Sequence, residues 1–131
     1  MGSEDKSLSN SLLRKLLTIL EVHEPVDWST SYAGQWNAGR WHSGCVPCLS
    51  ESDIQLEDLL NIDYQKEILV TNTEQFLSGL PCNNALLWGA RGTGKSSLVH
   101  ALLNRFAKKG LRLIQVSKED LFCLSQIVGE L

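Results

Sequence analysis

Four residues that suit a phosphate-binding loop lie in the stretch LLWGARGTGKSSLVHALL, residues 86–103. The pattern G-x-x-x-x-G-K-[ST] is met there by Gly89, Gly94, Lys95 and Ser96. Glycines let the backbone turn tightly and present successive N–H groups to a phosphate. The lysine reaches the β- and γ-phosphates, and the hydroxyl after it is placed to ligate Mg²⁺. The spacing therefore predicts a site for a nucleoside triphosphate and Mg²⁺.

The predicted loop has a strand before it and a helix after it. The loop consists of Gly89, Ala90, Arg91, Gly92, Thr93, Gly94, Lys95, Ser96 and Ser97. The apolar stretch ALLW, residues 85–88, predicts the strand, and a stripe of apolar residues predicts a helix from about Ser96 to Lys109, capped by Gly110. Such a helix would direct free N–H groups and its positive dipole end at the anion. Ser96 is the predicted Mg²⁺ ligand.

The segments after the loop predict the rest of a sheet. LRLIQV, residues 111–116, has the pattern of a second buried strand, and Ser117 with Asp120 should open a final helix. Strand, helix, strand and helix in this order predict a parallel sheet with right-handed crossovers. We therefore expect an α/β fold over residues 55–131.

The region before the loop predicts helices and one irregular stretch. Leucines at helical spacing predict a helix over about 11–22. Residues 27–53 show no steady period and should be irregular. A longer helix should start near Asp63 and end at the cap Gly79. Residues 1–54 are thus expected to form an N-terminal extension. The tryptophans are interpreted as packing residues: Trp28, Trp36, Trp41 and Trp88.

Composition narrows the class of protein. Of the 131 residues, 43% are hydrophobic and 21% are charged, which is ordinary for a domain with a packed core. The net charge of −3 argues against a dominant nucleic-acid role, since phosphate-reading surfaces need a basic excess. No apolar run is long enough to span a bilayer, and the N-terminus lacks the apolar region of a signal peptide. We expect a cytoplasmic protein with reduced cysteines and no membrane partner.

The stretch NNALLWGARGTGKSSLVHALLNRFAKKGLRLIQVSKEDL resembles a bacterial family of predicted AAA+ ATPases that is catalogued as a domain of unknown function. Its members carry a closely similar loop, and the upstream LEDLLNIDYQKEIL is similar as well, so the resemblance covers about residues 40–131. It implies a P-loop NTPase fold, ATP with Mg²⁺ as ligands, and a homo-oligomeric ring. It also implies adenine contacts from Leu60 and Ile62. Asn61 replaces the family's usual glycine, and asparagine tolerates the positive φ expected there.

Hydrolysis needs acids that the chain does not display clearly. P-loop ATPases use an acidic pair after a later strand to hold Mg²⁺ and activate water. The one candidate, Glu119-Asp120, fits better as the first turn of the last helix. In the AAA+ strand order, later strands separate 85–88 from 111–116, so we expect the N-terminal part of an ATPase, truncated after its second core strand. The alternative is a nucleotide-responsive interaction module that binds ATP without hydrolysis. A GTPase is disfavoured because no N-K-x-D or D-x-x-G motif occurs.

The cysteines leave three interpretations open. Cys45 and Cys48 form a C-x-x-C pair, with His42 three residues before it. Together with Cys82 these residues have the ligand types of a tetrahedral zinc site. The pair could instead be a redox dithiol, or two half-buried thiols without a chemical role.

Overall fold

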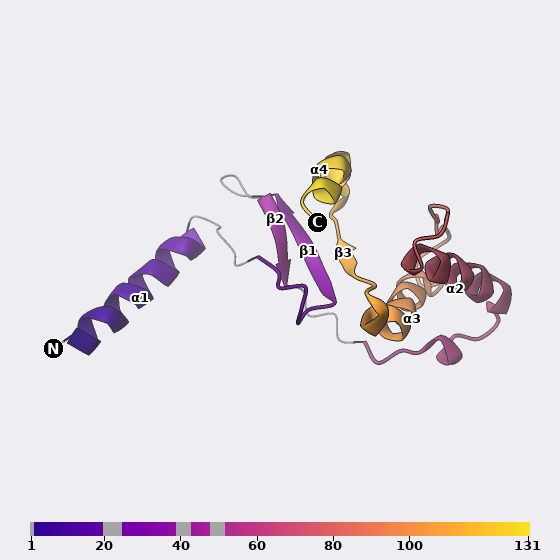
Figure 1. The fold of residues 1–131 in the computed structure, drawn as a ribbon, viewed down its shortest axis with the longest axis horizontal. Helices are drawn as coiled ribbons and strands as arrows, with labels where there is room; N and C mark the ends of the chain where they lie inside the picture. Colours follow the sequence, from indigo (N-terminus) through magenta and orange to yellow (C-terminus); the bar gives the residue numbers. More distant parts are fainter. Residues whose placement is uncertain (1, 20–24, 39–42, 48–51) are drawn as a thin grey trace. The chain divides into compact units, whose positions relative to one another are not determined.

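The computed structural model describes residues 2–19, 25–38, 43–47 and 52–131 (Figure 1). Contacts between Cα atoms divide the chain into two compact units. The first combines Met1–Leu49 with Ile114–Leu131, and the second is Ser50–Leu113. Helices and strands are both present, so the expected α/β class is confirmed.

Helix α1 of the first unit spans Gly2–Ile19 (Figure 1). The predicted helix over 11–22 therefore begins too late. No glycine or proline lies between Ser3 and Ile19, so nothing in the backbone stops helix propagation toward the N-terminus. The predicted end of this helix lies outside the described residues. Its leucines Leu8, Leu12, Leu13 and Leu16 are all more than half exposed.

A β-hairpin occupies part of the stretch that was expected to be irregular. Strand β1, Ala33–Ala38, pairs in antiparallel fashion with β2, Ser43–Pro47, and Trp36 lies opposite Cys45. The sequence AGQWNA gives little sign of a strand because its glycine, asparagine and alanines favour other structures. Cross-strand hydrogen bonding therefore decides the conformation. Trp36 is 3% exposed, which confirms its prediction as a packing residue.

The sheet has the strand order β2-β1-β3, where β3 is Leu113–Gln115. The predicted strand within 111–116 is thus confirmed, but the predicted strand at 85–88 is wrong. Residues 85–88 have no ladder pairing with any described segment, and a strand exists only beside a partner. The β1–β2 pair is antiparallel, unlike the wholly parallel sheet that was expected.

The chain ends in two short helical segments, η3 (Lys118–Cys123) and α4 (Leu124–Gly129). Ser117 is the N-cap of η3, and its Oγ donates a hydrogen bond to Asp120 Oδ2 at 2.7 Å. The Asp120 backbone N–H donates to the Ser117 carbonyl at 3.1 Å. The prediction that these two residues open a helix is confirmed, although the first turn is 3₁₀ in form.

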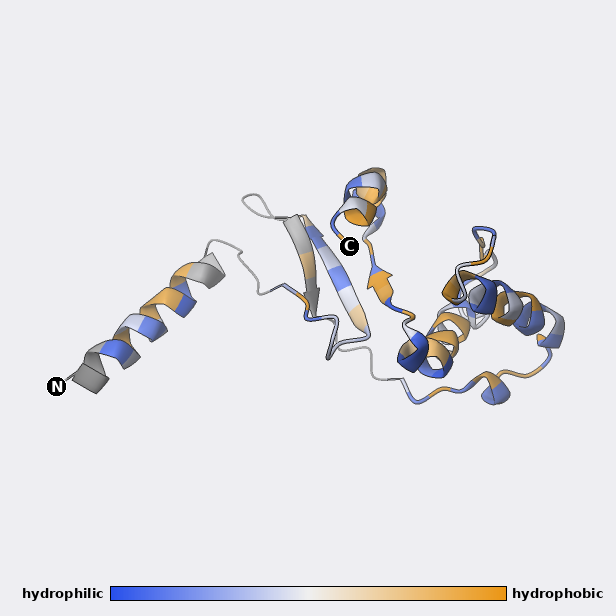
Figure 2. Cartoon of the chain, viewed as in Figure 1, coloured by the Kyte–Doolittle hydropathy of each residue, from blue (hydrophilic) through white to orange (hydrophobic). Residues whose placement is uncertain are grey.

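The second unit contains two helices packed through one apolar cluster. Its elements are η1 (Leu56–Asp58), α2 (Asp63–Leu77), α3 (Lys95–Phe106) and η2 (Ala107–Lys109). The cluster consists of Leu56, Leu98, Ala101, Leu102 and Phe106, with half-buried residues of α2 against it. Figure 2 shows the hydrophobic residues of α3 along the helix. The helix starts near Asp63 and Lys95 match the sequence predictions within a residue.

Several backbone positions in the second unit have a positive φ. Gly79 and Gly110, expected as helix caps, have φ of 69° and 105°. Asn61 has φ of 62°, and it is the single non-glycine residue with positive φ among those described. The expectation that asparagine would keep the turn made by glycine is therefore confirmed. In the described ranges, no helix is both long and apolar enough to cross a membrane.

Candidate functional site

The predicted phosphate loop turns sharply before it enters α3. Gly89, Gly92 and Gly94 have φ of 145°, 79° and 86°, values that residues with a Cβ rarely adopt. Gly94 is the N-cap of α3 in the left-handed conformation, and its carbonyl accepts a hydrogen bond from the Leu98 N–H at 2.9 Å. All three glycines of the loop therefore lie where the backbone needs glycine.

The start of α3 offers donors to an anion. The N–H groups of the first helical turn, which begins at Lys95, have no acceptor within the helix. The glycine at the N-cap supplies no side-chain acceptor for them. The positive end of the dipole of this 12-residue helix points the same way. Ser96, the predicted Mg²⁺ ligand, and Ser97 of the predicted loop both lie in this turn; Ser96 is exposed and Ser97 is half-buried.

Lys95 folds back over the loop that precedes it. Its Nζ donates to the Gly89 carbonyl at 2.8 Å, the Ala90 carbonyl at 2.6 Å and Thr93 Oγ1 at 3.1 Å. Thr93 Oγ1 in turn donates to the Ala90 carbonyl at 2.8 Å. The structure thus brings four predicted site residues into one polar cluster. The part played by Thr93 was not foreseen, because the motif accepts any residue at this position. Arg91 and Gly92 are exposed at the tip.

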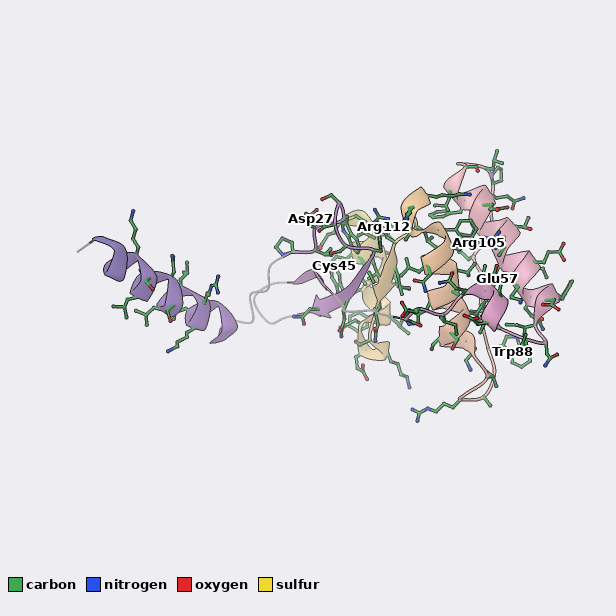
Figure 3. All side chains as sticks on the ribbon, turned by 90° about the horizontal axis from the view of Figure 1, so that it is seen from below. Asp27, Cys45, Glu57, Trp88, Arg105 and Arg112 are labelled. Atoms are coloured by element: carbon green, nitrogen blue, oxygen red, sulfur yellow. The ribbon has the colours of Figure 1, made fainter. Side chains whose placement is uncertain are left out.

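The segment that leads into the loop alternates between two environments. Leu87 packs against the apolar cluster, whereas Leu86 and Trp88 are 84% and 86% exposed (Trp88 is labelled in Figure 3). Leu87 is thus the residue of this stretch that contacts the apolar cluster, while both of its neighbours are exposed. The prediction that Trp88 packs is therefore wrong.

Asn72 of α2 fastens the same segment to the helix. Its Nδ2 donates to the Asn83 carbonyl at 2.7 Å, and its Oδ1 accepts from the Asn83 N–H at 2.9 Å. The side-chain amide thus pairs with the main chain as a neighbouring strand would. A hollow of about 320 Å³ lies beside this contact. It is lined by Gln65, Ile68, Leu69, Asn72, Asn83, Asn84, Ala85, Leu86 and Leu87.

The two residues proposed for the adenine lie in the turn before α2. Ile62 packs against the apolar cluster, and Leu60 is 76% exposed. Lys66 stabilises this turn: its Nζ donates to the carbonyls of Leu56 at 3.0 Å and Leu59 at 2.7 Å. Sequence reasoning missed Lys66. The signal available was its position one turn after Asp63, with which it forms an ion pair at 3.2 Å.

The remaining candidates are only partly described. His42 and Cys48 lie outside the described residues, so the zinc interpretation stays a prediction. Cys45 is half-buried in β2, and Cys82 is exposed. Within the described part of the chain, no three His, Cys, Asp or Glu side chains gather closely enough to hold a metal. The candidate acids Glu119 and Asp120 both lie in the first turn of η3, as expected for a helix start.

Residues 29–131 match the family described as a protein of unknown function, DUF815. The chain belongs to this family. The match includes the loop, both helices of the second unit and the β1–β2 hairpin. It therefore begins earlier than the resemblance seen in the sequence, which covered about residues 40–131.

One curated protein adds a distant relationship for this DUF815 chain. The replication factor C large subunit of Ignicoccus hospitalis is 38% identical to it over 68 residues. This alignment covers 50% of the chain and 14% of that protein, so the chain spans a small part of its relative. No solved structure gives a significant match.

Proposed function

We propose that residues 89–97 bind Mg·ATP as the Walker A loop of an AAA+-type ATPase. One observation carries the proposal. The loop glycines adopt positive φ angles and wrap the chain around the Lys95 ammonium, where α3 begins. A phosphate chain requires both parts of this arrangement, namely turned backbone with free N–H groups and a positive charge beside them.

Each residue of the proposed site has a distinct role. The N–H groups of 89–97 would surround the β-phosphate, and Lys95 would neutralise the β- and γ-phosphates. The Ser96 hydroxyl would ligate Mg²⁺, which bridges the phosphates and draws off their charge. Leu60 and Ile62 are proposed to contact the adenine. Ile62 is anchored in the apolar cluster, while Leu60 keeps its side chain available.

Membership of the DUF815 family and the similarity to a replication factor C large subunit support an AAA+ relationship. On this basis we propose that residues 55–131 belong to a P-loop NTPase domain, with 1–54 as an extension. The proposed protein would assemble as a homo-oligomeric ring.

A second function is nucleotide binding without hydrolysis. The candidate acids for activating water, Glu119 and Asp120, have a structural role instead. Asp120 accepts a hydrogen bond from Ser117, and Glu119 lies in the same helical turn. In this case Mg·ATP would change the affinity of the chain for a partner.

Calorimetric titration with Mg·ATP tests the binding proposal. We expect Lys95→Ala to weaken Mg·ATP binding strongly, whereas Lys108→Ala, which replaces an exposed lysine beyond α3, should bind as the wild type does. Equal binding by wild type and Lys95→Ala, or no binding by either, would refute the proposed site. Competition with GTP tests the choice of base.

Phosphate release measured beside the titration separates the two functions. Release that depends on Lys95 supports the ATPase, and saturable binding without release supports the second function.

A further inference from the structure

The three donors of the Lys95 ammonium are all used within the loop. An ammonium group has three N–H donors and no acceptor. In the structure they reach the Gly89 carbonyl, the Ala90 carbonyl and Thr93 Oγ1 at 2.8, 2.6 and 3.1 Å. We call these four groups, from Gly89, Ala90, Thr93 and Lys95, the lysine clasp. A phosphate can therefore accept a hydrogen bond from Lys95 only by displacing one member of the clasp.

The Thr93 hydroxyl makes the longest of the three contacts to Lys95 Nζ. The hydroxyl also donates a hydrogen bond to the Ala90 carbonyl at 2.8 Å. The Ala90 carbonyl accepts two hydrogen bonds, one from Lys95 and one from Thr93. Ionised phosphate oxygens accept from an ammonium more strongly than a neutral hydroxyl does. The hydroxyl is thus the member that a phosphate would replace.

A side chain at residue 89 would crowd the clasp. A Cβ built on Gly89 would lie 3.3 Å from Thr93 Oγ1 and 3.8 Å from Lys95 Nζ. By contrast, a Cβ on Gly92 or Gly94 would meet nothing within 4 Å. Close approach is therefore confined to the point where Gly89, Thr93 and Lys95 meet.

We propose that Thr93 is a positioning residue for Lys95. Its hydroxyl holds the ammonium against the Gly89 and Ala90 carbonyls, and a phosphate oxygen of the nucleotide takes its place. The first half of the proposal concerns the loop alone, and the second half rests on the proposed function. Thr93 thus influences how readily the Lys95 ammonium becomes available to hydrogen-bond a phosphate.

Lysine acylation tests the first half without any nucleotide. Thr93→Val removes the hydroxyl and keeps the shape of the side chain. We expect it to raise the rate of Lys95 acylation by sulfo-NHS-acetate about two- to fivefold, the lower part of the range for loss of one hydrogen bond. Lys108 and Lys109, both exposed beyond α3, are internal standards for the mass-spectrometric rates. Thr93→Ser keeps a hydroxyl and should restore the slow rate.

Mg·ATP titration tests the second half through a double-mutant cycle. Thr93→Val should tighten Mg·ATP binding about two- to fivefold, because the ligand no longer displaces the hydroxyl. AMP, which lacks the phosphates that reach Lys95, should bind equally to both forms. In a Lys95→Ala background the same substitution should have no effect on residual binding, since the coupled partner is gone. Circular dichroism confirms that each variant is folded.

Two results would overturn the proposal. One is a Lys95 acylation rate that Thr93→Val leaves unchanged relative to the two standards. The other is weaker Mg·ATP binding when Thr93→Val is introduced into either the wild type or Lys95→Ala. The hydroxyl would then affect binding through the conformation of the loop and not through Lys95. Failure of the wild type to bind Mg·ATP would refute the proposed function and the phosphate step, while the acylation rates would still decide whether Thr93 holds Lys95.

Discussion

Replacing Gly89 with alanine should weaken Mg·ATP binding far more than it weakens the fold. The φ of Gly89 is 145°, and an added Cβ would lie 3.3 Å from Thr93 Oγ1. That separation is tight for a methyl group, and the neighbouring hydroxyl is held by the Ala90 carbonyl. The alanine variant must therefore change its φ or push the hydroxyl aside.

The size of the effect follows from the backbone. A residue with a Cβ that is held at a φ favouring glycine is less stable by about 1–3 kcal/mol. We take about 2 kcal/mol in total, which corresponds to about a thirtyfold loss of affinity. The loop is exposed and lies outside the apolar cluster, so it can relax when no ligand holds it. The unfolding free energy should accordingly fall by less than about 1 kcal/mol, as for most surface changes.

Two other glycines serve as matched controls. Gly92 has φ of 79° but open space around its Cβ position, so Gly92→Ala should show the backbone penalty alone. Gly129, at the end of α4, has neither a positive φ nor a close neighbour, and Gly129→Ala should behave as wild type. Calorimetry gives the affinities and urea denaturation the stabilities. Mg·ATP affinity of Gly89→Ala within twofold of Gly129→Ala would refute the reasoning.

Three further predictions concern stability and pH. Phe106 is 0% exposed, so Phe106→Ala should lower the unfolding free energy in urea by about 3–5 kcal/mol, whereas Phe122→Ala, at a position 86% exposed, should change it little. Lys66→Met leaves two main-chain carbonyls without their donor and should lower the same quantity by about 1–3 kcal/mol; an unchanged midpoint would contradict this. The hydrogen bond from the Ser29 side chain, with that from its N–H, holds the pKa of Asp27 below its usual value. Its contribution to stability is therefore present above the unfolded pKa and lost as pH falls through the folded one. NMR titration should show the Asp27 midpoint rise in Ser29→Ala, and an identical midpoint would exclude the hydroxyl as the cause.

Features that depend on a few neighbouring residues could be predicted from the sequence. Helix α2 starts at Asp63 and is followed by Gly79 at positive φ, as the pattern indicated. Asn61 takes the positive φ expected of a residue that replaces glycine. These outcomes follow from local sterics and helix capping, which short stretches of sequence determine.

Features that depend on distant residues could not be predicted. The hairpin strand Ala33–Ala38 has weak strand propensity and exists because Ser43–Pro47 pairs with it. Residues 85–88 have the apolar pattern of a buried strand and lack a paired neighbour among the described residues. Propensity describes how well a residue fits a sheet, whereas the hydrogen-bonding partner decides whether the sheet forms. The two errors therefore have a single physical origin.

The candidate site falls between these two cases. The spacing of the motif identifies Gly89, Gly94 and Lys95, because the backbone conformation that the site needs is encoded in those residue types. The clasp that joins them depends on a hydroxyl at residue 93, a position where the motif makes no demand. The motif specifies the residues that contact a phosphate. It does not specify the residues that position those groups before a ligand binds. Thr93 belongs to this second kind, so it became visible only once the donors of Lys95 were traced to their acceptors.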